Sequence, residues 1–236
     1  MKFRKNEFIH FMLENNVIKF FSEPVKLKSG RYSYFYINWR SVTNSVRKID
    51  KLCDYLINFI DDNEIEFDCL FGIPEGATKI AVITQYKYAK RCKKKRDFLL
   101  AMGRGKIKDH GLLEDRYFIG VPKGRVIIIE DVVTTGNSVL KWVNIIQEIG
   151  ANIVGVIALT DRYEKGLNNK HISEILKEMK IPYHYLVNAL EILPKAFEFY
   201  NVEPHIIKEV IRYYEKYGVN KLVIEKKNEE NRYYKD

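Results

Sequence analysis

The stretch Val126-Ile-Ile-Ile-Glu-Asp-Val-Val-Thr-Thr-Gly-Asn-Ser138 runs from apolar residues into two acids and then into small hydroxylated residues and a glycine. Its first four residues are all β-branched, which is typical of a strand buried on both faces of a sheet. Glu130 and Asp131 follow at the end of this strand, and Thr134–Ser138 leads into a helix. Because ligands in open parallel sheets bind beyond the carboxyl ends of strands, the stretch predicts an α/β fold and the position of its site.

The rest of the chain alternates apolar runs with amphipathic segments, the pattern of βαβ units. Strands are expected at 32–40, 67–73, 97–102, 125–130, 153–159, 183–187 and 221–225. Helices are expected at 6–16, 44–62, 78–91, 136–149, 172–179 and 204–218, with a basic turn at 26–31 and a glycine-containing loop at 103–124. Apolar strands joined by helices predict a mostly parallel, doubly wound sheet flanked by helices.

The chain shows no internal repeat and no linker that would divide it. We expect one domain at 1–190, with a small N-terminal hood at about 1–40 that binds substrate. A helical extension at 191–236 is expected to pack on this domain or to trail from it, and its charged last residues to be frayed.

Composition limits the classes of partner. The 236 residues include 46% hydrophobic ones, enough for a sizeable core, and the net charge of +9 favours an anionic partner such as a phosphorylated metabolite, nucleic acid or acidic lipid. No run of about 18 apolar residues occurs, so no membrane span is expected. The three cysteines, Cys53, Cys69 and Cys92, form no CxxC pair, and we expect a reduced, cytoplasmic protein.

The segment Thr134, Thr135, Gly136, Asn137 and Ser138 can bind a phosphate monoester, because backbone N–H groups, hydroxyls and a helix N-terminus meet there. The acids before it repel phosphate but accept hydrogen bonds from sugar hydroxyls, so a phosphorylated ribose is expected. On these residues alone, a strand end with an ordinary helix cap and solvated acids remains an alternative. The G-x-x-x-x-G-K-[ST] loop of nucleotide triphosphatases is absent.

The full string resembles the 5-phosphoribosyl-1-diphosphate (PRPP) signature of type I phosphoribosyltransferases. Three further segments resemble one branch of them, the orotate phosphoribosyltransferase family. Leu27–Arg31, followed by Ser33, Phe35 and Asn38, is similar to its substrate loop. Gly103–Gly111 is similar to its mobile catalytic loop, and Gly72–Lys79 to its diphosphate loop. The resemblance covers about residues 5–190.

The resemblance implies roles for individual residues. Arg104, Lys108 and His110 would act on the leaving diphosphate, with Lys106, Gly76 and Lys79 near it. Glu130 and Asp131 would hold the ribose, Asp131 also serving catalysis, while Lys28, Thr134 and Arg162 would contact orotate. The resemblance also implies magnesium, held mainly by the diphosphate and through water by Glu130 or Asp131 rather than by direct protein ligands. A homodimer that shares the mobile loop is implied as well, with no nucleic acid or membrane partner.

Departures from the family pattern include two positions near the diphosphate. Many members have lysine where this chain has Gly76 and Gly105. Lys79 and Lys106 are the candidates to replace them, and the number of cations at the diphosphate stays open. Alternative interpretations stay open for two further features. Arg162 can form a plain salt bridge with Asp161 or Glu164, and the run Lys106–His110 can be an ordinary solvated loop. The resemblance implies synthesis of orotidine 5′-monophosphate on the route to UMP. The alternatives are a purine-base phosphoribosyltransferase and a nucleic-acid-binding regulator with the same fold.

Overall fold

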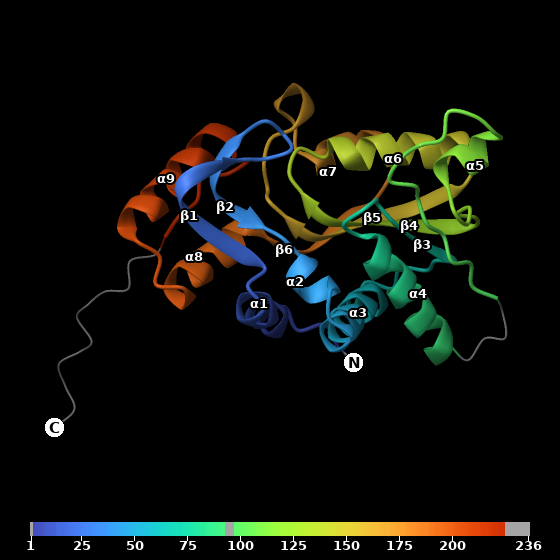
Figure 1. Cartoon of the computed structure of the whole chain (residues 1–236), viewed down its shortest axis with the longest axis horizontal. Helices are drawn as coiled ribbons and strands as arrows, with labels where there is room; N and C mark the ends of the chain where they lie inside the picture. The colour runs from blue at the N-terminus through green and yellow to red at the C-terminus, as the bar shows by residue number, and fades with distance from the viewer. Residues whose placement is uncertain (1, 93–96, 225–236) are drawn as a thin grey trace.

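The computed structural model describes residues 2–92 and 97–224 (Figure 1). A parallel sheet contains β3 (Cys69–Gly72), β4 (Arg125–Val133), β5 (Asn152–Asp161) and β6 (Tyr183–Asn188), in that order. An antiparallel hairpin contains β1 (Ile18–Lys26) and β2 (Tyr32–Ile37). The helices are α1 (Lys5–Glu14), α2 (Arg40–Thr43), α3 (Val46–Asp62), α4 (Thr78–Arg91), α5 (Leu113–Tyr117), α6 (Asn137–Glu148), the short 3-10 helix η1 (Leu167–Asn169), α7 (Ile172–Glu178), α8 (Ala189–Phe199) and α9 (Pro204–Tyr217).

The parallel sheet is covered on both faces, as its apolar strands predict. Along β4, Ile127 and Ile129 join one hydrophobic cluster with residues of α3, α4 and α8, while Val126 and Ile128 join a second cluster with residues of α6 and α7. Successive side chains of a strand point to opposite faces, so a strand buried on both sides needs an unbroken apolar run. The predicted fold class, a parallel sheet flanked by helices with a small N-terminal hood, is confirmed.

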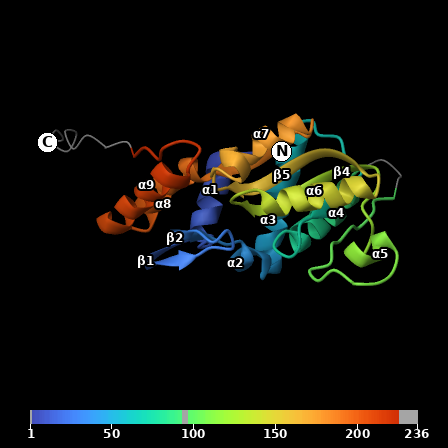
Figure 2. The same ribbon diagram turned by 90° about the horizontal axis from the view of Figure 1, so that it is seen from above.

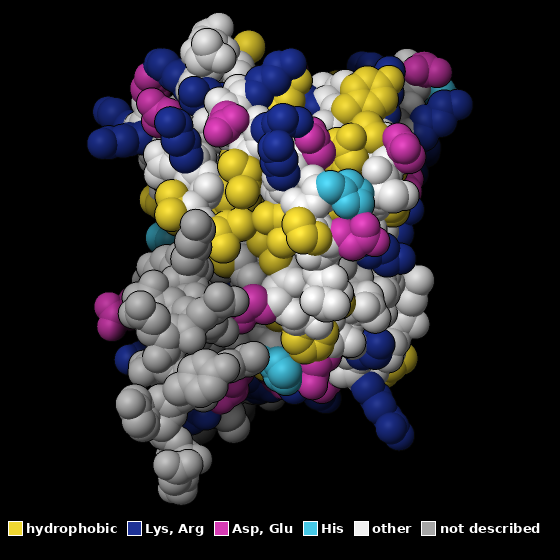
Figure 3. Space-filling model, turned by 90° about the vertical axis from the view of Figure 1, so that its left-hand side faces the viewer, with side chains coloured by type: hydrophobic (Ala, Val, Ile, Leu, Met, Phe, Trp, Pro, Cys, Tyr) yellow, Lys and Arg dark blue, Asp and Glu magenta, His cyan; other side chains and the backbone are white. Residues whose placement is uncertain are grey.

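The hood and the C-terminal helices pack together at one end of the molecule (Figures 1 and 2). The rings of Phe20 and Phe197 lie 5.3 Å apart, and those of Phe35 and Tyr214 lie 6.0 Å apart. Figure 3 shows this end face, where hydrophobic side chains form a band across the middle with Lys and Arg side chains above it. The strands β1 and β2 and the helices α8 and α9 therefore contribute to one continuous core with the sheet.

Several sequence-based expectations were wrong. Residues 97–102 do not form a strand, because their backbone bonds instead to the end of the long loop: Met102 N–H donates to Gly120 O (3.1 Å), and Ile119 N–H donates to Met102 O (2.7 Å). Without that strand, the order of the described strands follows the chain and does not reverse. Residues 221–224 are not a strand either, and residues 225–236 of the expected extension lie outside the described residues.

Four of the described helices were missing from the prediction, namely α2, α5, α8 and the 3-10 helix η1. α5 lies within the segment expected to be a loop, and α8 directly follows β6. α8 begins with a reciprocal cap in which Asn188 Oδ1 accepts from Glu191 N–H (2.9 Å) and Glu191 Oε2 accepts from Asn188 N–H (2.9 Å). No helix in the described part of the chain combines the length and apolar character that a membrane crossing needs.

Candidate functional site

A cavity of about 590 Å³ lies at the carboxyl ends of β4 and β5. It is lined by Leu27, Lys28, Ser29, Tyr36, Ile37, Asn38 and Arg40 of the hood and α2, by Pro74–Gly76 and Gly105, by Glu130–Val139, and by Arg162. The cavity therefore lies where the apolar-to-acidic stretch predicts a site. It brings together Lys28, Gly76, Glu130, Asp131, Thr134–Ser138 and Arg162, which are far apart in the sequence.

The loop after β4 has the geometry of an anion site. Gly136 caps α6 with φ of +80°, a left-handed conformation that favours glycine, and a Cβ there would overlap the side chain of Ile172. Behind the same loop, Gly166 lies directly against the carbonyl oxygen of Thr135. The twelve-residue α6 carries no acid in its first turn, so its positive N-terminal end can attract phosphate at the cavity wall.

The two acids of β4 lie in different surroundings. Glu130 is only 7% exposed, and burial together with the neighbouring charge of Asp131 raises the pKa of Glu130 well above its usual value. Asp131 is half-buried and lies on the backbone of Gly76, where a Cβ would overlap its carboxylate. A lysine at position 76 is therefore incompatible with this placement of Asp131, which gives a physical reason for the departure at Gly76.

Arg162 joins the hood to the sheet. Its Nε donates to Glu164 Oε1 at 2.6 Å, its Nη2 donates to Ser33 Oγ at 3.2 Å, and its guanidinium lies 3.9 Å from the centre of the Phe35 ring. The salt bridge with Glu164 that the sequence left open is therefore present. Arg162 nevertheless lines the cavity, so it is held in place at the wall rather than removed from it.

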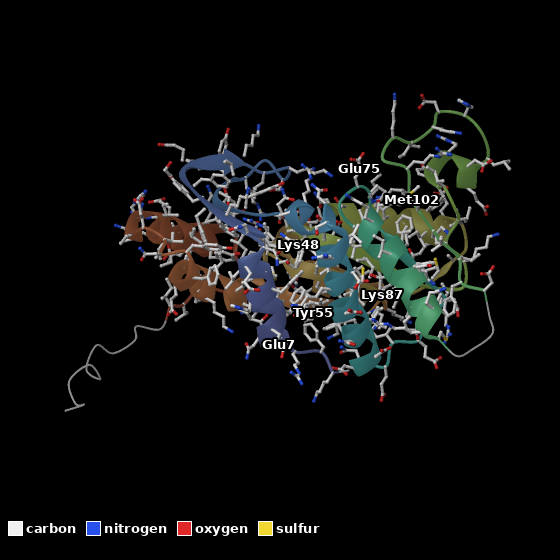
Figure 4. The ribbon with its side chains drawn as sticks, turned by 60° about the horizontal axis from the view of Figure 1, so that its bottom comes forward. Glu7, Lys48, Tyr55, Glu75, Lys87 and Met102 are labelled. Carbon is white, nitrogen blue, oxygen red and sulfur yellow. The ribbon has the colours of Figure 1, made fainter. Side chains whose placement is uncertain are left out.

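The other side of the cavity has fewer fixed cations. Lys79 points to α2, where its Nζ donates to Thr43 O (3.0 Å) and Asn44 Oδ1 (3.3 Å). This contact ties the first turn of α4 to α2, and Lys79 is not among the residues that line the cavity, so its role at the diphosphate stays a prediction. Figure 4 shows Glu75 just before α4, and the neighbouring Pro74 lies against Gly103 at the start of the long loop. Glu75 also lies against Gly105, where a Cβ would overlap its carboxylate.

The expected loop cations lie outside the cavity in this conformation. Arg104, Lys106, Lys108 and His110 are not among the lining residues. Arg104 Nε donates to Asp115 O (3.0 Å), while Lys108 N–H donates to Arg116 O (3.1 Å) and so ties the loop to α5. The structure thus assembles the phosphate loop, the acids and the hood, and leaves these four side chains outside.

Comparisons with known proteins agree with this geometry. A model described as a phosphoribosyl transferase domain matches residues 42–186, more than half of the chain. The orotate phosphoribosyltransferase of Yersinia enterocolitica is 33% identical over 93% of this chain and 100% of its own length. The chain belongs to the orotate phosphoribosyltransferase family. The family prediction made from the four motifs is therefore confirmed.

Solved structures of other proteins have a fold similar to that of this chain. The orotate phosphoribosyltransferase of Francisella tularensis has a TM-score of 0.66 and 27% identity, with 90% of this chain and 99% of that chain covered. The UMP synthase of Leishmania donovani has a TM-score of 0.68 at 20% identity, with 88% of this chain and 41% of that chain covered, and it shows the fold alone.

Several polar or charged residues that line the cavity were given no role of their own in the sequence analysis, although Ser29 and Glu75 lie within its motif segments. Ser29 and Tyr36 belong to the hood, Arg40 begins α2, and Glu75 follows β3. Glu75 carried the same signal as Glu130, an acid just beyond the carboxyl end of a buried strand. Arg40 had no such signal, because its position depends on a short turn in which its N–H donates to Asn38 Oδ1 at 2.9 Å.

Proposed function

We propose that the chain transfers the ribose 5-phosphate group of PRPP to orotate, giving orotidine 5′-monophosphate and diphosphate on the route to UMP. The observation that carries the proposal is the one cavity that is lined by a helix N-terminus, two acids, Lys28 and Arg162 together. These groups match the chemistry of a sugar phosphate joined to a base that bears a carboxylate.

Each part of the two substrates has a place in this arrangement. The 5-phosphate lies in the loop Thr134–Ser138, where N–H groups and hydroxyls donate to it. Asp131 accepts hydrogen bonds from the ribose hydroxyls, with Glu130 beneath it. Lys28 and Arg162 face the orotate carboxylate, which a purine base lacks, and this favours orotate over purines.

Departure of diphosphate builds negative charge that needs cations and proton donors aimed at it. We assign this work to Arg104, Lys106, Lys108 and His110, which reach the cavity when the segment 103–124 closes. Closure also protects the sugar cation at C1 from water. Gly105 already lines the cavity, so a short movement of its neighbours brings them to the same wall.

The same segment supports a dimer in which the loop is shared. The segment 103–124 and the residues just before it expose large apolar side chains, namely Leu99, Leu100, Leu112 and Ile119. Apolar surface of this kind is common where two copies of a chain pack together. A second copy covering this segment would bring the loop of one protomer close to the cavity of the other.

Magnesium fits the donor set of the cavity. Glu75, Glu130 and Asp131 supply carboxylate oxygens there, and among the described residues no three His, Cys, Asp or Glu side chains form a cluster that could hold a metal by themselves. We therefore propose that the ion binds mainly to diphosphate oxygens, with Asp131 or Glu130 holding its water. Bound there, it would offset the charge that develops on the leaving group. We further propose that the enzyme works in the cytoplasm.

The test is the loss of orotate absorbance when the purified chain is mixed with PRPP, with and without magnesium. Adenine, hypoxanthine and uracil serve as alternative acceptors in the same buffer. Magnesium-dependent consumption of orotate, with little use of the other bases, is the expected result. Turnover of a purine without turnover of orotate would overturn the proposal.

A further inference from the structure

A buried carboxylate joins two arginines that come from different parts of the chain. Glu164 Oε1 accepts from Arg162 Nε at 2.6 Å, and Glu164 Oε2 accepts from Arg31 Nη1 at 2.5 Å. The side chain of Glu164 is fully shielded from solvent, and Arg31 also donates to Lys165 O at 2.6 Å. Because Arg31 ends the loop that carries Lys28, this carboxylate ties the hood to the wall of the cavity.

The C-terminal helix α9 completes the same network. Tyr213 Oη donates to Glu164 Oε2 at 2.9 Å, and Tyr214 Oη donates to the carbonyl oxygen of Arg162 at 2.8 Å. The ring of Tyr217 lies 4.6 Å from the Arg31 guanidinium. The end of α9 is also tied through the backbone, where Lys165 N–H donates to Tyr217 O at 2.8 Å.

The charges of this network do not cancel. Two guanidinium groups face one carboxylate, and their other described hydrogen-bond partners, Ser33 Oγ and the carbonyl oxygens of Phe35 and Lys165, are neutral. Aromatic faces offset part of the surplus, since Arg162 lies over Phe35 and Arg31 over Tyr217. A buried surplus of positive charge is costly, and an anion at the cavity wall beside Arg162 would relieve it.

We propose that Glu164 and Tyr213 are positioning residues for Arg162 and Arg31, so that the C-terminal helix α9 forms part of the orotate-binding side of the cavity. The proposal rests on the proposed function, because it takes the orotate carboxylate as the anion that binds to Arg162. An arginine fixed before the ligand arrives loses less conformational entropy on binding. The network therefore acts on the affinity for orotate and leaves the chemistry at the diphosphate unchanged.

The first test is Tyr213→Phe, which keeps the ring and removes one hydrogen bond to Glu164. We expect the KM for orotate to rise roughly fivefold, the effect of losing one typical intramolecular hydrogen bond, because Tyr213 acts on Arg162 only through Glu164. The KM for PRPP and kcat should stay within about twofold. The matched control is Tyr200→Phe, which removes the bond from Tyr200 Oη to Leu13 O (2.6 Å) at the end of α8, away from Arg162. It should change none of the three constants.

Glu164→Gln is the stronger variant, because it removes the charge that both arginines share. We expect the KM for orotate to rise by about tenfold or more, with thermal unfolding recorded to show that the variant is folded. Equal KM values for orotate in Tyr213→Phe and wild type would overturn the proposal. A matching loss in the KM for PRPP and in kcat, or the same effect in Tyr200→Phe, would also overturn it.

A measurement without substrates separates this proposal from the proposed function. The Nε–H proton of Arg162 should exchange slowly with water in the NMR spectrum of the wild-type chain, and at least about tenfold faster in Tyr213→Phe. Unchanged exchange in that variant would refute the positioning role even if orotate is the substrate. Faster exchange in a chain that does not use orotate would keep the positioning role and refute the proposed function.

Discussion

The two sides of the cavity are built in opposite ways. On the hood side, Arg162 is 2% exposed and bonded to Glu164, Ser33 and the hood backbone. On the loop side, two glycines, Gly76 and Gly105, leave room for carboxylates, and the expected cations lie elsewhere. The groups of the hood side are thus already in position, whereas we propose that the loop side is completed only when the segment 103–124 closes.

This difference agrees with what each side is proposed to do. A base with a fixed planar shape is best bound by groups already in position. A leaving diphosphate needs cations in the transition state, and a loop that closes only over bound substrate supplies them while it excludes water. We therefore expect substitutions on the loop side to change kcat or the use of PRPP, and those on the hood side to change the KM for orotate.

The largest effect is expected for Lys108→Ala. If the loop carries the lysine to the diphosphate, kcat should fall by about 10²–10³-fold, typical for loss of one fixed donor to developing charge. The KM for orotate should change little, because Lys108 is not among the residues that line the cavity. Steady-state kinetics give both constants, with Lys123→Ala, an exposed lysine of the same segment, as control. Equal losses in both constants would remove the difference between the two sides.

Asp131→Asn should act on PRPP rather than on orotate. The amide keeps the shape of the side chain but accepts hydrogen bonds from ribose hydroxyls less strongly, and it attracts magnesium less. We expect the KM for PRPP to rise by about 10–100-fold, corresponding to roughly 1.5–3 kcal/mol. Glu148→Gln, at the far end of α6, is the control. An unchanged KM for PRPP would take Asp131 out of the ribose site.

The two glycines of the loop side allow a paired comparison. In Gly76→Ala the new Cβ meets three atoms of the Asp131 carboxylate, so this side chain must move, and the KM for PRPP should rise by about tenfold. In Gly105→Ala the Cβ meets mainly Oε1, the far end of the Glu75 side chain, which can turn away. We expect a change of less than about twofold there. Similar losses in both variants would show that the loop side is more rigid than we infer.

The stretch from Val126 to Ser138 predicted its strand, its helix and the cavity, because local patterns and strand ends decide these features. Residues 97–102 were predicted wrongly, since an apolar run cannot reveal that its backbone bonds to residues 119 and 120. Lys79 looked available for phosphate, but its contact with Thr43 depends on how α4 packs against α2. Glu164 was named only as a possible partner of Arg162, because its other partners, Arg31 on the hood and Tyr213 on α9, depend on the tertiary packing.

The smallest effect is expected for Glu130→Gln, and it concerns stability. The raised pKa of Glu130 means that the folded state holds this proton more tightly than the unfolded state does. Below the ordinary pKa of glutamic acid both states are protonated, and the substitution should change stability little. As the pH rises from there toward the raised pKa, the unfolded state ionises first, so the wild type loses stability that the variant keeps. Urea unfolding at pH 4 and pH 8 measures this difference.

At pH 8 we expect Glu130→Gln to be more stable than the wild type by on the order of 1 kcal/mol, with a weaker affinity for PRPP. Glu148→Gln is the matched control, since it makes the same chemical change at an exposed glutamate at the far end of α6. The stability of Glu130→Gln relative to wild type should thus rise from pH 4 to pH 8. A fall over the same range would contradict the burial of an ionisable acid beneath the ribose. A gain in stability together with weaker PRPP binding would show that Glu130 lowers the stability of the folded state and contributes to PRPP binding.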